Sequence, residues 1–117
     1  MTSIRQWRII QKMIFIETPI FTKELQNFLT DEDYHSLQLA LLFRPEQGKI
    51  IRGSGGLRKI RWGTKGSGKR GGCRLIYYWD KKNETIYMLL VYPKSKQEDL
   101  TQAQMKILSR LFKEEFK

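Results

Sequence analysis

Residues 74–92, with the sequence RLIYYW-DKKNE-TIYMLLVY, hold the strongest secondary-structure signals in the chain. Residues 74–79 and 85–92 are rich in aromatic and β-branched side chains, which is typical of strands. The polar residues 80–84 between them form a connection too short for the crossover that parallel strands require. The segment therefore predicts an antiparallel hairpin and, with the elements around it, an α+β fold.

Two weaker strands precede this hairpin in the sequence. Residues 13–17 (MIFIE) are short, apolar and partly β-branched, and residues 57–62 (LRKIRW) are extended in character. The first twelve residues show no clear pattern and are interpreted as a loose N-terminal extension. The 117-residue chain contains no repeat, so we expect one domain over residues 13–117.

Three helices are predicted, two before the basic segment and one at the C-terminus. Thr18 and Pro19 supply an N-cap and a proline at the first helical position, and Thr30 followed by three acids begins a second helix. Thr101 and Gln104 form a capping box for the last helix. The predicted fold is an antiparallel sheet packed with two N-terminal helices and one C-terminal helix.

The positive charge of the chain is concentrated in its middle third. Residues 44–82 contain twelve Lys or Arg against two acids, a net charge of +10, while the other residues sum to zero. All nine glycines lie between Gly48 and Gly72. Such a concentrated charge predicts a polyanionic partner, and it favours nucleic acid over a membrane surface or an acidic protein.

Several function classes are disfavoured by composition. No apolar run approaches the roughly 20 residues that cross a bilayer, and the N-terminus lacks a signal-peptide pattern. The single cysteine and single histidine provide neither an internal disulfide nor enough zinc ligands. Arg70 and Arg74 would lower the pKa of Cys73, but without a histidine nearby in sequence a cysteine nucleophile is disfavoured. We expect a soluble, cytoplasmic domain without metal or cofactor.

The glycine-rich segment 63–72 (GTKGSGKRGG) lies between two predicted strands. Its glycines permit close approach of the backbone to a phosphate, and Lys65, Lys69 and Arg70 can neutralise several phosphates. The spacing of a nucleoside-triphosphate loop is absent and no helix follows directly. The alternative interpretation is a solvated hairpin tip whose lysines protect a sheet edge.

The cations on the strands indicate a phosphate site more directly. Lys59 and Arg61 are two residues apart and share one strand face. Arg74 begins the next strand and Lys94 follows the third, so an antiparallel meander can bring the four together. Clustered like charges are destabilising unless an anion compensates them.

Three aromatic residues near these cations have two interpretations. Trp62, Tyr78 and Tyr92 could stack on the bases of a single strand. Aromatic residues in half-buried strands are more often core or cross-strand partners.

Three motifs together resemble the HigB branch of the RelE/ParE toxin superfamily: GGLRKIR (55–61), KGSGKRGGCRLIYY (65–78) and LLVYPKSKQEDLT (89–101). The resemblance implies a RelE-like fold and a bacterial type II toxin that cleaves mRNA in the ribosomal A site as a metal-independent endoribonuclease. It also implies a cognate HigA-like antitoxin with a helix-turn-helix domain. The partners would be mRNA and the ribosome with its 16S rRNA, and operator DNA only through the antitoxin.

The resemblance also implies site residues. The catalytic set is Lys59, Arg61, Arg74, Tyr92 and Lys94, and the loop residues Lys65, Lys69 and Arg70 would hold ribosomal RNA or message. From the basic strand itself we add Arg58 and Trp62 to the RNA-binding set. Arg61 and Arg74 would stabilise the phosphate, and Lys59 or Lys94 would transfer protons, which arginine cannot do. RelE has a late tyrosine where this chain has Leu100, so Tyr92 is the nearest substitute.

Two rival functions remain open from the sequence. A ParE-like gyrase poison shares the fold but needs no phosphate-cleaving cluster on its strands. A non-catalytic RNA- or DNA-binding module would show salt-sensitive binding but no function specific to Lys59 or Arg74.

Overall fold

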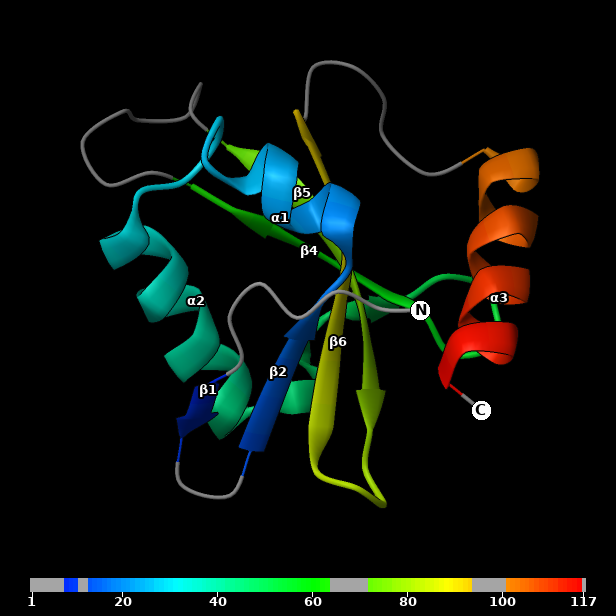
Figure 1. Cartoon of the computed structure of the whole chain (residues 1–117), viewed down its shortest axis with the longest axis horizontal. Coiled ribbons are helices and arrows are strands. Elements are labelled where there is room, and N and C mark those ends of the chain that lie inside the picture. The colour runs from blue at the N-terminus through cyan, green and yellow to red at the C-terminus, as the bar shows by residue number, and fades with distance from the viewer. Residues whose placement is uncertain (1–7, 11–12, 64–71, 94–100, 117) are drawn as a thin grey trace.

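The hairpin of β5 (Cys73–Asp80) and β6 (Thr85–Pro93) lies at the centre of the sheet, and its strands are antiparallel as predicted. A computed structural model describes residues 8–10, 13–63, 72–93 and 101–116 (Figure 1). The described strands form one sheet in the order β1-β2-β6-β5-β4-β3, completed by β1 (Arg8–Ile10), β2 (Met13–Glu17), β3 (Lys49–Ile50) and β4 (Arg58–Trp62). The predicted α+β class is confirmed.

One pairing departs from the expected antiparallel sheet. β2 runs parallel to β6, with Phe15 beside Ile86, while the other four pairings are antiparallel. The short turn at residues 81–84 sets the direction of β5 against β6 only. Because two helices and three strands separate β2 from β6 along the chain, the length of their connection does not restrict their relative direction. The sheet is therefore mixed.

The N-terminal segment is partly paired with the sheet. Residues 8–10, within the segment interpreted as a loose extension, form β1, which pairs antiparallel with β2.

The helices begin at the predicted capping residues. The Thr18 side chain accepts a hydrogen bond from Phe21 N (3.2 Å) at the start of α1 (Pro19–Leu25). Thr30 accepts one from Asp33 N (3.1 Å) at the start of α2 (Asp31–Phe43), which is followed by the 3₁₀ turn η1 (Pro45–Gln47). The reciprocal capping box confirms the start of α3 (Gln102–Phe116): Gln104 Oε1 accepts from Thr101 N (3.0 Å) and Thr101 Oγ1 accepts from Gln104 N (3.1 Å). These side chains satisfy N–H groups that lack partners within the helix.

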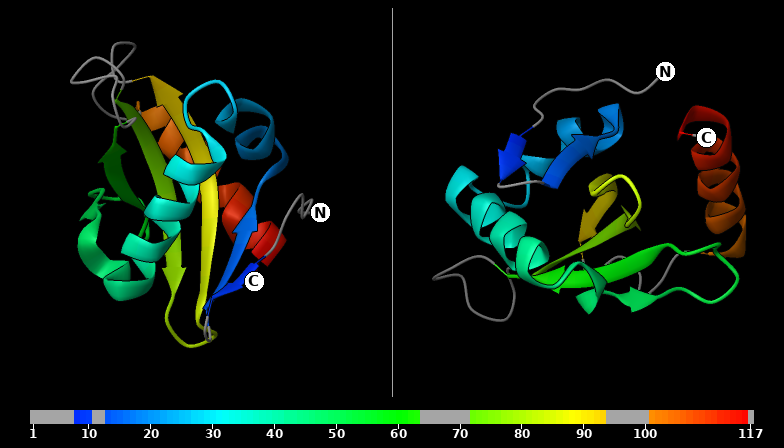
Figure 2. Two further views of the ribbon diagram at one scale, coloured as in Figure 1. Left: turned by 90° about the vertical axis from the view of Figure 1, so that its left-hand side faces the viewer. Right: turned by 90° about the horizontal axis from the view of Figure 1, so that it is seen from below.

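The two faces of the sheet support separate apolar clusters. The first lies between the sheet and helices α1 and α2, and includes Phe15, Phe21, Leu37 and Tyr77. The second contains Ile51, Leu57, Ile76, Leu89 and Tyr92, against which Met105 and Leu108 of α3 pack. Figure 2 shows α2 and α3 on opposite sides of β5 and β6. No helix among the described residues has the length and apolar character needed to cross a bilayer.

Candidate functional site

Three of the predicted catalytic residues occupy one row across the sheet. In the strand register, Arg61 of β4 lies opposite Arg74 of β5, and Arg74 lies opposite Tyr92 of β6. Directly opposed residues of antiparallel strands project from the same face, with their Cβ atoms about 4.5–5.5 Å apart. Two arginines and a tyrosine, up to 31 residues apart in the chain, therefore lie side by side on the face that carries the second apolar cluster.

A second row adds two lysines to this face. Lys59 is two residues from Arg61 on β4, and its partner on β3 is Lys49. We call Lys49, Lys59, Arg61, Arg74 and Tyr92 the cationic face. Lys49 entered the sequence prediction only through the net charge, because a two-residue strand has no recognisable alternation.

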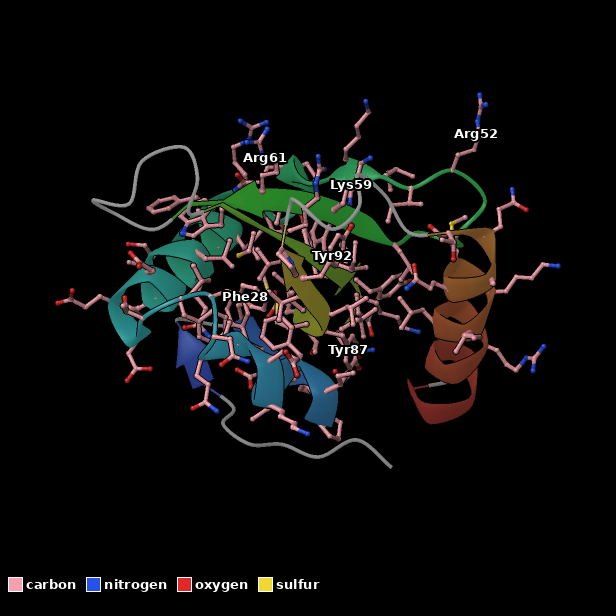
Figure 3. The ribbon with its side chains drawn as sticks, turned by 90° about the horizontal axis from the view of Figure 1, so that it is seen from above. Phe28, Arg52, Lys59, Arg61, Tyr87 and Tyr92 are labelled. Atoms are coloured by element: carbon pink, nitrogen blue, oxygen red, sulfur yellow. The ribbon has the colours of Figure 1, made fainter. Side chains whose placement is uncertain are left out.

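Burial increases across the cationic face from the sheet edge to its centre. Arg61 and Lys49 are exposed and Lys59 is half-buried, whereas Arg74 is 8% exposed and Tyr92 9% exposed. Arg74 and Tyr92 lie on the central strands, with Tyr92 part of the second apolar cluster. Charge interactions are stronger where water is excluded, so the buried end of the row is where a guanidinium acts most strongly on an anion. In Figure 3, Arg61 and Lys59 lie along one side of the molecule, with Tyr92 further inward.

Arg58 and Trp62 lie on the opposite face of β4 from the cationic face. Trp62 packs against the first apolar cluster. Arg58 Nη1 donates hydrogen bonds to the backbone oxygens of Glu46 and Gly48, both at 2.7 Å. The structure thus separates these two residues, assigned to RNA binding from the sequence, from the predicted catalytic residues.

The Arg58 contacts belong to an anchor that holds η1 against the sheet. The buried Tyr77 hydroxyl donates to Pro45 O (2.7 Å) and accepts from Gly48 N (2.8 Å). Burial, as the main cause, raises the pKa of Tyr77, so the neutral hydroxyl that makes both bonds is favoured. A Cβ atom on Gly48 would lie 2.6 Å from the Tyr77 hydroxyl oxygen, which explains the glycine at this position. This anchor positions β3, and with it Lys49.

Tyr78 is a cross-strand partner, which is the second of the two interpretations given for the aromatic residues of the strands. Its ring lies 6.5 Å from that of Tyr87, its partner on β6, and both pack against the second apolar cluster. Of the three aromatic residues, Tyr92 is the one that lies directly beside a cation of the row, Arg74.

Cys73 is in a different environment from the one expected from its neighbours in sequence. The side chain is fully buried in the first apolar cluster, and burial raises its pKa to about 11. The expected lowering by Arg74 is wrong, because adjacent residues on a strand project to opposite faces. The thiol is therefore not an activated nucleophile.

The remaining candidates are placed as follows. His35 is exposed on α2. Lys65, Lys69, Arg70 and Lys94 lie outside the described residues. Within the described ranges, no group of three or more His, Cys, Asp or Glu side chains is arranged to hold a metal ion. No protein-family model matches the chain.

Proposed function

We propose that the protein is the toxin of a type II toxin–antitoxin system, a ribosome-dependent endoribonuclease that cleaves mRNA in the A site and so inhibits translation. The observation that supports this proposal best is the cross-strand row Arg61–Arg74–Tyr92 with Lys59 beside it. These are four of the five residues to which the resemblance to HigB and RelE toxins assigns catalysis. The first and last of these residues are more than thirty positions apart in the chain, so it is the fold that brings them together.

The row suits cleavage of a phosphodiester by the neighbouring 2′-hydroxyl. The 2′ oxygen bonds to phosphorus while the bond to the 5′ oxygen breaks, leaving a 2′,3′-cyclic phosphate and a 5′-hydroxyl. Negative charge increases on the phosphoryl oxygens in the transition state, and fixed cations stabilise that charge more than the ground state. Arg61 and Arg74 hold this role, with Arg74 in the more buried position.

Two protons must also move in this reaction. One leaves the attacking 2′-hydroxyl and one is delivered to the departing 5′ oxygen. Arginine does not exchange protons near neutral pH, whereas lysine and tyrosine can. Lys59 and Tyr92 of the cationic face are the described candidates, and the resemblance adds Lys94 for the same role.

The proposal includes a cytoplasmic location and a protein inhibitor. The resemblance implies a HigA-like antitoxin with a helix-turn-helix domain, through which the complex would contact operator DNA. Arg61 and Lys49 are exposed, so a partner can mask the outer part of the cationic face by charge complementarity.

The experiment is primer extension on a reporter mRNA in a reconstituted translation system, beside the same RNA without ribosomes. We expect cuts only in the translated message, and their loss in Arg61→Ala and Lys59→Ala. Arg61 is exposed, so its replacement should leave the fold intact. Arg74→Ala should abolish cutting as well, but because Arg74 is buried, this variant requires a thermal melt to show that it is folded.

The matched control is Lys82→Ala, which removes an exposed positive charge from the turn between β5 and β6. It should cut as the parent protein does. Intact message in all reactions would contradict the proposal and direct the work to gyrase supercoiling assays, the test of a ParE-like poison. Cutting by the parent that persists in all three face variants would show a nuclease whose site lies elsewhere.

A further inference from the structure

The cationic face continues past the proposed reaction site, toward the sheet edge and the loop that joins β3 to β4. Lys49 lies opposite Lys59 at the edge of the sheet, and Arg52 follows on the loop. Both side chains are exposed, and neither is among the residues to which the resemblance assigns a role. In Figure 3, Arg61, Lys59 and Arg52 lie in that order along one side of the molecule.

The loop that carries Arg52 is held in one conformation by its own hydrogen bonds. Ile51 N donates to Leu57 O (2.8 Å), which closes the loop at its base. The buried Ser54 hydroxyl donates to Ile51 O (2.6 Å) and accepts from Leu57 N (2.9 Å). Ile51 and Leu57 are both buried in the second apolar cluster, so the loop is fixed to the core.

Glycines permit the tight path of this loop. Gly53, Gly55 and Gly56 have φ angles of +76°, +81° and +109°, a region that other residues rarely adopt. The chain thereby turns back within a few residues and leaves Arg52 directed to solvent from an ordered base. An arginine on such a base loses less conformational entropy on binding than one on an unstructured loop.

The strand register concentrates positive charge on this face. Lys49 lies opposite Lys59, and Arg61 lies opposite Arg74. Residues two apart on a strand are separated by about 6.8 Å, and consecutive phosphates of an extended single strand have a similar separation. The interval between Lys59 and Arg61 therefore matches that between consecutive phosphates.

We propose that Lys49 and Arg52 form a binding track for the backbone of single-stranded RNA, and that they hold the nucleotides beside the phosphate positioned at Arg61 and Arg74. This inference rests on the proposed function, which supplies the RNA substrate, and it adds the residues that hold the substrate outside the reacting bond. The track is electrostatic, so it selects for backbone and not for base sequence.

The test measures binding as a function of salt with an RNA that cannot be cut. The probe is a 2′-O-methyl oligonucleotide of about ten nucleotides, within the range that single-strand sites cover. Each phosphate contact contributes about 0.7 to the slope of log affinity against log salt. Lys49→Ala/Arg52→Ala should therefore reduce the slope by about 1.4. Between about 50 and 200 mM salt, the affinity of the parent should fall about 7-fold more than that of the variant.

The matched control is Lys82→Ala/Arg110→Ala, which removes an exposed lysine from the turn between β5 and β6 and an exposed arginine from α3. Its slope should equal that of the parent. An equal reduction in both double variants, an unchanged slope in Lys49→Ala/Arg52→Ala, or no binding by the parent at the lowest salt would overturn the inference.

This result is separable from that of the cleavage experiment. If the parent cuts message but Lys49→Ala/Arg52→Ala has the salt slope of the parent, the track is refuted and the nuclease proposal stands. If the slope is reduced but no message is cut, the protein binds RNA along the track and is not a nuclease.

Discussion

Arg58 and Arg61 lie three residues apart on β4 and project from opposite faces, and we expect their replacement to have opposite consequences. Arg58 donates two hydrogen bonds of 2.7 Å to the backbone oxygens of Glu46 and Gly48. A hydrogen bond from a charged group contributes about 1.5–3 kcal/mol to the free energy of unfolding. One of the two is exposed, so the pair should contribute about 2–3 kcal/mol, taking the lower part of that range.

Arg58→Ala should therefore lower the free energy of unfolding by about 2–3 kcal/mol. Urea denaturation of the purified variant measures this, and the slope against urea should stay that of the parent because the surface exposed on unfolding is unchanged. RNA cleavage under folding conditions should also stay that of the parent, because Arg58 projects from the face opposite the catalytic row. Arg61→Ala is the comparison: it should lose RNA cleavage with a change in stability within about 0.5 kcal/mol.

The reasoning would be refuted by the reverse pattern. An Arg58→Ala variant with the stability of the parent and weakened RNA binding would show that Arg58 contacts RNA, as the sequence analysis expects, and that its bonds to the backbone oxygens of Glu46 and Gly48 contribute nothing to stability.

Two further predictions concern buried groups. Gly48→Ala should destabilise the protein by about 2–4 kcal/mol in urea denaturation, because its Cβ would lie 2.6 Å from the Tyr77 hydroxyl and displace a buried ring; a variant as stable as the parent would contradict this packing. Cys73 has a folded-state pKa of about 11 against 9.0, so its contribution to stability is complete below pH 9 and is lost as the pH rises toward 11. The stability difference between the parent and Cys73→Ala should decrease by up to about 3 kcal/mol over that interval, and a constant difference would show that the thiol is not desolvated.

Local signals in the sequence account for most of the secondary structure. Thr18, Thr30 and the Thr101–Gln104 box act through hydrogen bonds within four residues, and the structure confirms all three helix starts. The hairpin of β5 and β6 is likewise determined by a connection of four residues between two apolar strands. In each case the interactions that decide the structure lie within the segment that carries the signal.

Part of the candidate site also follows from the sequence. Alternation along β4 places Lys59 and Arg61 on one face, and the same alternation places Arg58 and Trp62 on the other. The separation of Arg58 and Trp62 from the catalytic row therefore follows from the sequence as well. The same alternation explains why Arg74 does not lower the pKa of Cys73. The two residues are adjacent in the chain but project from opposite faces of the sheet.

The sequence by itself determined the α+β class, the helix starts, the central hairpin and the concentration of charge. Only the tertiary structure decided the parallel pairing of β2 with β6, the row Arg61–Arg74–Tyr92 and the position of Lys49 opposite Lys59. These depend on strand register, which is set by packing of both sheet faces and by the contacts of Tyr77 and Arg58 with η1. Such contacts join residues far apart in the chain, so no window of the sequence contains both partners.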